Sequence, residues 1–165
     1  MSQHIHIRQL NSDAIMPAYA HDNDAGMDVY AAEEVIIPPG HTVAVPTGVA
    51  LAIPEGYEIQ IRPRSGLSLN TMLRIPNSPG TIDAGFRDEV KIIMHNASPE
   101  GWDSPDEQIH SVTSKGNPKG IYIIRKGDRI AQMVCAKVEH VTFIPVDTLE
   151  GIGTDRKGGF GSTGQ

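Results

Sequence analysis

Asp83 stands in a run whose residue types could support general-base chemistry. In "GTIDAGFRDEV" it precedes the small residues Ala84 and Gly85, where a ligand could approach the backbone closely, and Phe86 follows. A carboxylate held near apolar neighbours can act as a general base toward water. Phe86 offers a flat apolar face to a sugar or a base. A core phenylalanine beside a turn aspartate is the alternative interpretation.

A second pair of acids, Asp24 and Asp28, flanks Gly26 in "DAGMDVYA". Two carboxylates near a glycine can serve a divalent cation or orient an arginine, and a turn capped by aspartates is the structural alternative. The scattered histidines and the single cysteine, Cys135, do not give the ligand set of a zinc site. They also lack the flanking residues of a nucleophile–histidine system.

The run "RPRSGLSL" suits a phosphate-bearing ligand. Arg64 is followed by the Ser65 hydroxyl and the Gly66 N–H at an expected helix start, and such donors bind phosphate groups well. A surface turn with solvated arginines is the alternative.

The run "RKGDRIAQMV" brings an arginine and an amide to the start of an apolar strand. Arg129 could pair with a neighbouring acid. Gln132 alternates with Ile130 and Val134, which predicts that the three side chains share one face. An amide on an apolar face needs a partner.

Residues 157–165, "KGGFGSTGQ", have the glycine and hydroxyl content of a phosphate-cradling loop. A P-loop needs a strand before it and a helix after it. No helical pattern follows this run, so an ordinary P-loop is not expected.

The composition bounds the class of protein. One cysteine in 165 residues allows no internal disulfide, which fits a reducing cytoplasm. The net charge of −6 argues against general nucleic-acid binding. No apolar stretch is long enough for a membrane span, and the N-terminus does not have the pattern of a signal peptide.

The elements that must position these residues are expected to be short strands. Seventeen glycines and twelve prolines recur along the chain, a density that long helices do not tolerate. We expect an all-β barrel, jelly roll or sandwich, with a strand in "HIHIRQL" and one short helix near "SGLSLNTML", capped by Ser65. "TID" and "EVKII" predict a hairpin. The polar residues 97–120 predict a long surface loop inserted between two strands.

Taken in order, five runs resemble the five motifs of the trimeric deoxyuridine triphosphatases (dUTPases). They are "DAGMDVYA", "RPRSGLSL", "GTIDAGFRDEV", "GDRIAQMV" and "RKGGFGSTG". The resemblance implies a jelly-roll-like (β-clip) all-β subunit and a homotrimer with active sites shared between subunits. It implies hydrolysis of dUTP to dUMP and pyrophosphate with Mg²⁺. It also divides the chain into a domain over 1–150, including the insert 97–120, and a C-terminal arm over 151–165 that closes the site.

The resemblance assigns roles by position. Asp83 matches the aspartate that activates water for attack on the α-phosphorus, and Asp28 matches an aspartate that holds a water on Mg²⁺. Arg64, Ser65, Gly66 and Gln132 match contacts to the phosphate chain. The contacts to uracil and deoxyribose match Asn77, Gly80, Thr81, Ile82, Asp83 and Phe86, with Lys91 at the edge. In the arm, Phe160 matches a ring that stacks on uracil, Arg156 a contact to the γ-phosphate, and Gly161 and Ser162 further phosphate contacts.

Two alternatives remain open at the level of sequence. A dCTP deaminase, or a bifunctional deaminase–triphosphatase, shares this fold, but it needs a glutamate where this chain has Ile93 and favours a serine where it has Gly66. A nucleotide-dependent regulatory module could use the insert 97–120 to bind a protein partner, and such a role could coexist with catalysis.

Overall fold

Strands make up nearly all of the regular secondary structure, as the computed structural model of residues 4–101 and 108–155 shows. The strands and the single helix are β1 (His6–Gln9), β2 (Met27–Tyr30), β3 (Val35–Ile37), β4 (Thr42–Ala52), β5 (Tyr57–Arg62), α1 (Ser65–Asn70), β6 (Leu73–Arg74), β7 (Gly80–Ile82), β8 (Glu89–Asn96), β9 (Ile109–Ser111), β10 (Ile121–Ile124) and β11 (Arg129–Lys137). No helix in these ranges is long and apolar enough to cross a membrane.

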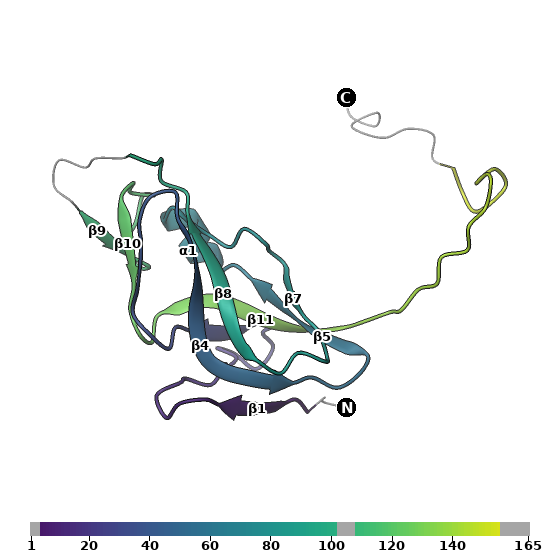
Figure 1. Cartoon of the computed structure of the whole chain (residues 1–165), viewed down its shortest axis with the longest axis horizontal. Coiled ribbons are helices and arrows are strands. Elements are labelled where there is room, and N and C mark those ends of the chain that lie inside the picture. The colour runs from purple at the N-terminus through teal and green to yellow at the C-terminus, as the bar shows by residue number, and fades with distance from the viewer. Residues whose placement is uncertain (1–3, 102–107, 156–165) are drawn as a thin grey trace.

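Two four-stranded sheets form the body of the subunit, which confirms the all-β prediction (Figure 1). One sheet has the order β1-β4-β8-β6, and the other has the order β2-β11-β5-β7. A three-stranded sheet, β3-β10-β9, lies at one end. Val45 and Ile92 from the first sheet share one apolar core with Ile59 and Met133 from the second.

Period-two patterning explains how the strands bury one face. In β8, Val90, Ile92 and Met94 are buried, while Lys91 and Ile93 between them point outward. The long strand β4 bends where its register with β8 shifts, between Pro46 and Ala50. Gly48 sits at this bend with a positive φ of 68°. A Cβ there would lie 2.7 Å from Ala14, so only glycine fits.

The expected hairpin from "TID" and "EVKII" is wrong, because these strands do not pair with each other. β7 pairs with β5, and β8 pairs with β4 and β6 in the other sheet. Residues 83–88 therefore cross from one sheet to the other. A period-two pattern identifies a strand but does not identify its partner.

Two smaller expectations also need correction. Ser65 begins α1 but does not cap it: the capping position belongs to Arg64, which makes no side-chain cap hydrogen bond. The insert 97–120 is not entirely loop, because β9 lies within it and pairs in parallel with β10. Thr113 and Lys115 farther along are exposed, as expected for a surface excursion.

After β11, residues 138–155 lead away from the body without regular secondary structure (Figure 1). Several large apolar side chains of this segment are exposed. They are Val141, Phe143, Ile144, Val146, Leu149 and Ile152, with Phe143 88% accessible. An exposed apolar series of this kind marks an interaction surface.

Candidate active site

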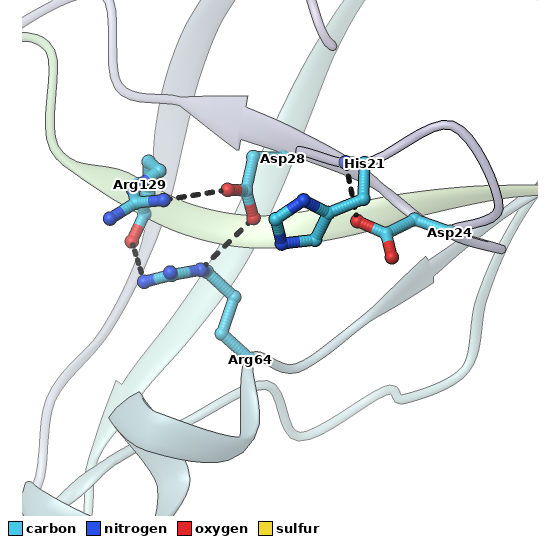
Figure 2. Close-up of polar contacts among 5 residues, drawn as sticks. All are labelled: His21, Asp24, Asp28, Arg64 and Arg129. Carbon is cyan, nitrogen blue, oxygen red and sulfur yellow. Dashed lines mark hydrogen bonds and ion pairs between the residues drawn. The ribbon is translucent and has the colours of Figure 1, made fainter. Parts of the chain in front are cut away.

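The buried carboxylate of Asp28 is the centre of an ion-pair cluster (Figure 2). Its Oδ1 accepts a hydrogen bond from Arg64 Nε at 3.1 Å, and its Oδ2 accepts one from Arg129 Nη1 at 3.0 Å. Arg64 Nη1 also donates to the Arg129 carbonyl oxygen at 3.3 Å. The strand register explains why these side chains lie close together. Gln132 of β11 lies between Asp28 of β2 and Arg62 of β5, so the start of β11 and the end of β5 are both near Asp28. Since Asp28 is only 6% exposed, its charge-assisted bonds hold both guanidinium groups in place.

Asp24, in contrast, caps an exposed turn. Its Oδ2 accepts a hydrogen bond from the His21 backbone N–H at 2.9 Å (Figure 2). The two acids of "DAGMDVYA" therefore have different roles: Asp24 takes the structural role of a turn cap, and Asp28 orients arginines.

The cluster limits how a magnesium ion could be held. Both Asp28 oxygens already accept from guanidinium groups, so direct coordination would require breaking an ion pair. Among the residues that the structure describes, no group of three His, Cys, Asp or Glu side chains could hold a metal ion. Mg²⁺ commonly keeps several waters and binds substrate phosphates. Asp28 thus fits a role behind a bound water and does not fit that of a direct ligand.

Gln132 lies against Gly26, which joins the first and fourth sequence motifs. A Cβ built on Gly26 would lie 3.2 Å from Gln132 Oε1 and 3.3 Å from Gln132 Cβ. The expected common face is only partly correct. Gln132 and Val134 are both half-buried, but Ile130 is fully buried, because a bulge between Arg129 and Ala131 interrupts the alternation.

Gly26→Ala is expected to displace Gln132 and thereby lower kcat/KM about tenfold for dUTP hydrolysis, the reaction that the family resemblance implies. The free energy of unfolding should fall by less than about 1 kcal/mol. Gly26 has no positive φ, so alanine strains no backbone there. Steady-state kinetics and thermal unfolding of the single variants and the double variant with Gln132→Ala form the test. If Gly26→Ala lowers the rate equally in the Gln132→Ala background, its effect does not run through Gln132.

The first turn of α1 presents backbone donors to solvent. Ser65 and Gly66 are the first two residues of α1, and the first N–H groups of a helix have no acceptor within it. A Cβ on Gly66 would meet no atom within 4 Å. The backbone at Gly66 is therefore open to a ligand, beside Arg64 of the ion-pair cluster.

At one edge of the same sheet, β7 has backbone donors and acceptors that pair with no neighbouring strand. It is the last strand of its sheet, pairing only with β5 through Gly80↔Ile61 and Ile82↔Ile59. The other edge of its backbone is unpaired within the sheet, so its donors and acceptors are available to a ligand. The Asn77 side chain packs on Gly80, where a Cβ would lie 3.2 Å from Asn77 Nδ2.

Asp83 directly follows β7 and begins a tight turn. Phe86 N donates to the Asp83 carbonyl oxygen at 3.1 Å, and the Phe86 side chain is 38% exposed. Asp83, Ala84 and Gly85 line a cleft of about 440 Å³, together with residues 55–58, Val138 and His140. The Asp83 carboxylate thus belongs to a residue that borders open space.

Arg87 positions this turn, and sequence reasoning did not assign it a role. Its Nη1 donates to the carbonyl oxygens of Ala84 and Phe86, the latter at 2.8 Å. The signal available in the sequence was an arginine directly after the aromatic residue of "DAGFRD". Lys91 lies elsewhere: it is on β8 of the other sheet, exposed, 3.6 Å from Glu89.

Within one chain, Asp83 does not lie close to the Ser65 and Gly66 donors that suit a phosphate group. Ile82 pairs with Ile59 near the start of β5, whereas Ser65 follows the far end of that strand. At about 3.3 Å per residue, the separation between Asp83 and Ser65 is on the order of 20 Å. Arg156, Phe160, Gly161 and Ser162 lie outside the described residues.

Cys135 does not fit a nucleophilic thiol, and Ile93 does not fit the proton-transfer position of a deaminase. Burial raises the pKa of the Cys135 thiol, so the reactive thiolate is disfavoured at neutral pH. Ile93 lies on the outward face of β8, where an apolar side chain cannot transfer the protons that a deaminase moves.

Comparisons with known proteins agree with this arrangement. The sequence model of the dUTPase family matches residues 12–101 and 111–164. The deoxyuridine 5'-triphosphate nucleotidohydrolase of Clostridium kluyveri is 40% identical over 159 residues, which cover 96% of each chain. The corresponding protein of Thermobifida fusca is 41% identical over 160 residues, covering 97% of this chain and 78% of that one.

Solved structures give the same result. The Staphylococcus bacteriophage 80alpha dUTPase with dUpNHpp has a TM-score of 0.88 and 32% identity, covering 99% of this chain and all of that one. A mutant dUTPase from phage phi11 of S. aureus, described with a structural Mg(II) ion, has a TM-score of 0.80 and 30% identity over 90% and 99% of the two chains. The motifs, the two-sheet fold and these matches together show that the chain belongs to the dUTPase family.

Proposed function

We propose that this protein hydrolyses dUTP to dUMP and pyrophosphate. The observation that carries the proposal is the edge strand β7, which presents unpaired backbone groups and ends at the carboxylate of Asp83. Backbone donors and acceptors of Thr81 to Asp83 can pair with uracil as another base would. Such a slot excludes the thymine methyl group sterically and mispairs with the amino group of cytosine.

The chemistry assigned to Asp83 is that of a general base. Its carboxylate accepts a proton from water as the water oxygen attacks the α-phosphorus. The bond between the α-phosphorus and the bridging oxygen breaks, and pyrophosphate leaves. The half-exposed Phe86 ring stacks on deoxyribose and leaves no room for a 2′-hydroxyl. Lys91, on β8, is proposed only as an edge contact.

The phosphate chain is assigned to the other cluster. Arg64, Ser65 and the Gly66 N–H bind it, with Gln132 near the α-phosphate, since charged and backbone donors suit phosphate oxygens. Mg²⁺, when bound, neutralises charge on the phosphates, and Asp28 holds one of its waters. The support for Mg²⁺ is the phi11 enzyme, whose structure is described with a structural Mg(II) ion.

The test of this function is product analysis with a panel of nucleotides. Purified protein with Mg²⁺ should convert dUTP to dUMP and pyrophosphate and leave dTTP, dCTP and UTP nearly untouched. Release of ammonia from dCTP would favour the deaminase alternative. Equal turnover of UTP would contradict the role of Phe86.

The active site is proposed to be completed by neighbouring subunits of a homotrimer. Two observations support this: Asp83 and Ser65 lie at opposite ends of β5, and residues 138–155 expose an apolar series. Burial of that series on a second copy would remove it from water. The family resemblance implies that residues 151–165 close over a neighbouring site. In this proposal Phe160 stacks on uracil, Arg156 contacts the γ-phosphate, and Gly161 and Ser162 contact the phosphates.

Co-expression of two inactive variants, Asp83→Asn and Arg64→Ala, is expected to restore activity. With random mixing of chains, about a quarter of the sites receive both native residues from different subunits. Wild-type protein should sediment at three times the 17.8 kDa subunit mass. Absence of recovery in a confirmed mixed trimer, or an active monomer, would contradict the shared site.

Two further expectations accompany this function. A cytoplasmic location fits a nucleotide substrate and a single unpaired cysteine. A protein partner at the insert 97–120 stays a prediction, which a pulldown with and without the insert can test.

A further inference from the structure

The insert makes direct hydrogen bonds to the end of helix α1. The Asn117 backbone N–H donates to the Asn70 carbonyl oxygen at 2.9 Å, and Asn117 Nδ2 donates to the Leu69 carbonyl oxygen at 2.7 Å. The last carbonyl groups of a helix have no N–H partner within it, so they need outside donors. Asn117 supplies two of these donors from 47 or 48 positions farther along the chain.

These contacts continue to the first turn of the helix. Asn70 Nδ2 donates to the Gly66 carbonyl oxygen at 2.8 Å. α1 has only six residues, and helices this short are not stable by themselves. The position of Ser65 and Gly66 therefore depends on contacts that hold the other end of α1, and Asn117 makes two of them.

The residues that follow Asn117 are held by a buried polar network. Tyr122, fully buried, accepts a hydrogen bond from Met72 N at 3.1 Å and donates one to the Pro118 carbonyl oxygen at 2.7 Å. Asn96, also fully buried, donates from Nδ2 to the Gly120 carbonyl oxygen at 2.8 Å. Residues 117–120 are thus hydrogen-bonded to the body of the subunit through Tyr122 and Asn96. This segment can therefore act as a rigid support for the end of α1.

The backbone of Asn117 also suits this role. Its φ is 52°, in the left-handed region that asparagine and glycine tolerate better than other residues. This conformation lets the N–H and the side-chain amide point at successive carbonyl groups of α1. Asn117 lies a few residues beyond positions 102–110, which the dUTPase family model passes over.

We propose that Asn117 is a positioning residue for the phosphate chain of the substrate: by holding the end of α1, it sets the location of Ser65 and the Gly66 N–H. The proposal rests on the proposed function of this turn. The proposal predicts different effects on two parts of the ligand. Binding of the β- and γ-phosphates should depend on Asn117, whereas binding of the nucleoside at β7 should not.

Asn117→Gly is the variant of choice, because glycine keeps the positive φ and the backbone N–H while removing the side-chain donor. Asn117→Asp is a second variant, which keeps the shape and replaces the amide donor with an oxygen facing Leu69. Ser114→Ala is the matched control. It removes a hydrogen bond within the insert, from Ser111 N to Ser114 Oγ at 3.0 Å, that does not touch α1.

The measurement is calorimetric binding of dUpNHpp and of dUMP to each intact protein with Mg²⁺. Losing one hydrogen bond that orders the phosphate turn should weaken dUpNHpp binding about fivefold in Asn117→Gly and more in Asn117→Asp. Binding of dUMP should change less than twofold, and Ser114→Ala should change neither. Melting temperatures recorded alongside show that each variant is folded.

The outcomes separate cleanly. Equal weakening of both ligands, or weakening in Ser114→Ala as well, would mean that Asn117 has only a general structural role. Unchanged dUpNHpp binding in both folded Asn117 variants would overturn the proposal while leaving the proposed function intact. Failure of the wild-type protein to bind dUpNHpp would overturn the proposed function and this inference together.

Discussion

Replacing Asp83 with asparagine is expected to lower kcat for dUTP by about 10²–10⁴-fold, the range in which general-base catalysis contributes. Asparagine keeps the size of the side chain and can still hold a water, but it cannot accept the proton at neutral pH. Binding of dUpNHpp should change less than about threefold, because the carboxylate acts on the attacking water and the other contacts remain. Single-turnover kinetics with calorimetric binding separates the two quantities.

Asp88→Asn is the matched control for this experiment. Asp88 lies five residues farther along the same crossing segment and is exposed. The same change of charge there should leave kcat within about twofold, as surface substitutions usually do. A rate for Asp83→Asn close to that of Asp88→Asn would remove the proposed base, whatever the effect on binding.

Replacing Asp28 with alanine is expected to destabilise the fold as well as the site. The change leaves Arg64 and Arg129 without the carboxylate that each contacts at about 3 Å. Hydrogen bonds to charged groups contribute about 1.5–3 kcal/mol each. Because the Arg129 side chain is 51% exposed and can be solvated, we expect a total loss of only about 3 kcal/mol, or roughly 10 °C in Tm.

Asp24→Ala provides the comparison, since it removes a carboxylate from the same loop. Asp24 caps an exposed turn through one hydrogen bond, so the expected loss is about 1 kcal/mol or less. Both variants should be melted at one protein concentration, because assembly shifts apparent stability. If Asp28→Ala melts no lower than Asp24→Ala, the ion-pair cluster around Asp28 does not stabilise the fold.

Much of the fold could be predicted because it depends on local signals. Alternation in "EVKIIMHN" predicts a strand with one buried face, and the structure places Val90, Ile92 and Met94 inside. The resemblance of five motifs predicted the family, which the comparisons confirm. Pairing with an acid was one interpretation of Arg129 that the sequence allowed, and the structure shows it, but the identity of that acid came from the register between β2 and β11.

What could not be predicted is mostly long-range. The strands around Asp83 were recognised, but their partners were not, because pairing is decided by packing between residues distant in sequence. The contacts of Asn117 with α1 join positions nearly fifty residues apart, and no local pattern in "SKGNPKG" indicates them. The same holds for Arg87, whose side chain folds back on its own turn.

The proposal that β5 separates Asp83 and Ser65 into two different sites makes turnover depend on assembly of the chains. If the two halves of a site come from different subunits, specific activity should fall on dilution below the assembly constant, even though each chain stays folded. A copy that lacks one of the two parts would disable one site of a mixed trimer, so the activity lost would equal its share of the protein. A copy that lacks both parts would disable two sites, each shared with a healthy neighbour. It would therefore cost more activity than its share, which is a dominant-negative effect.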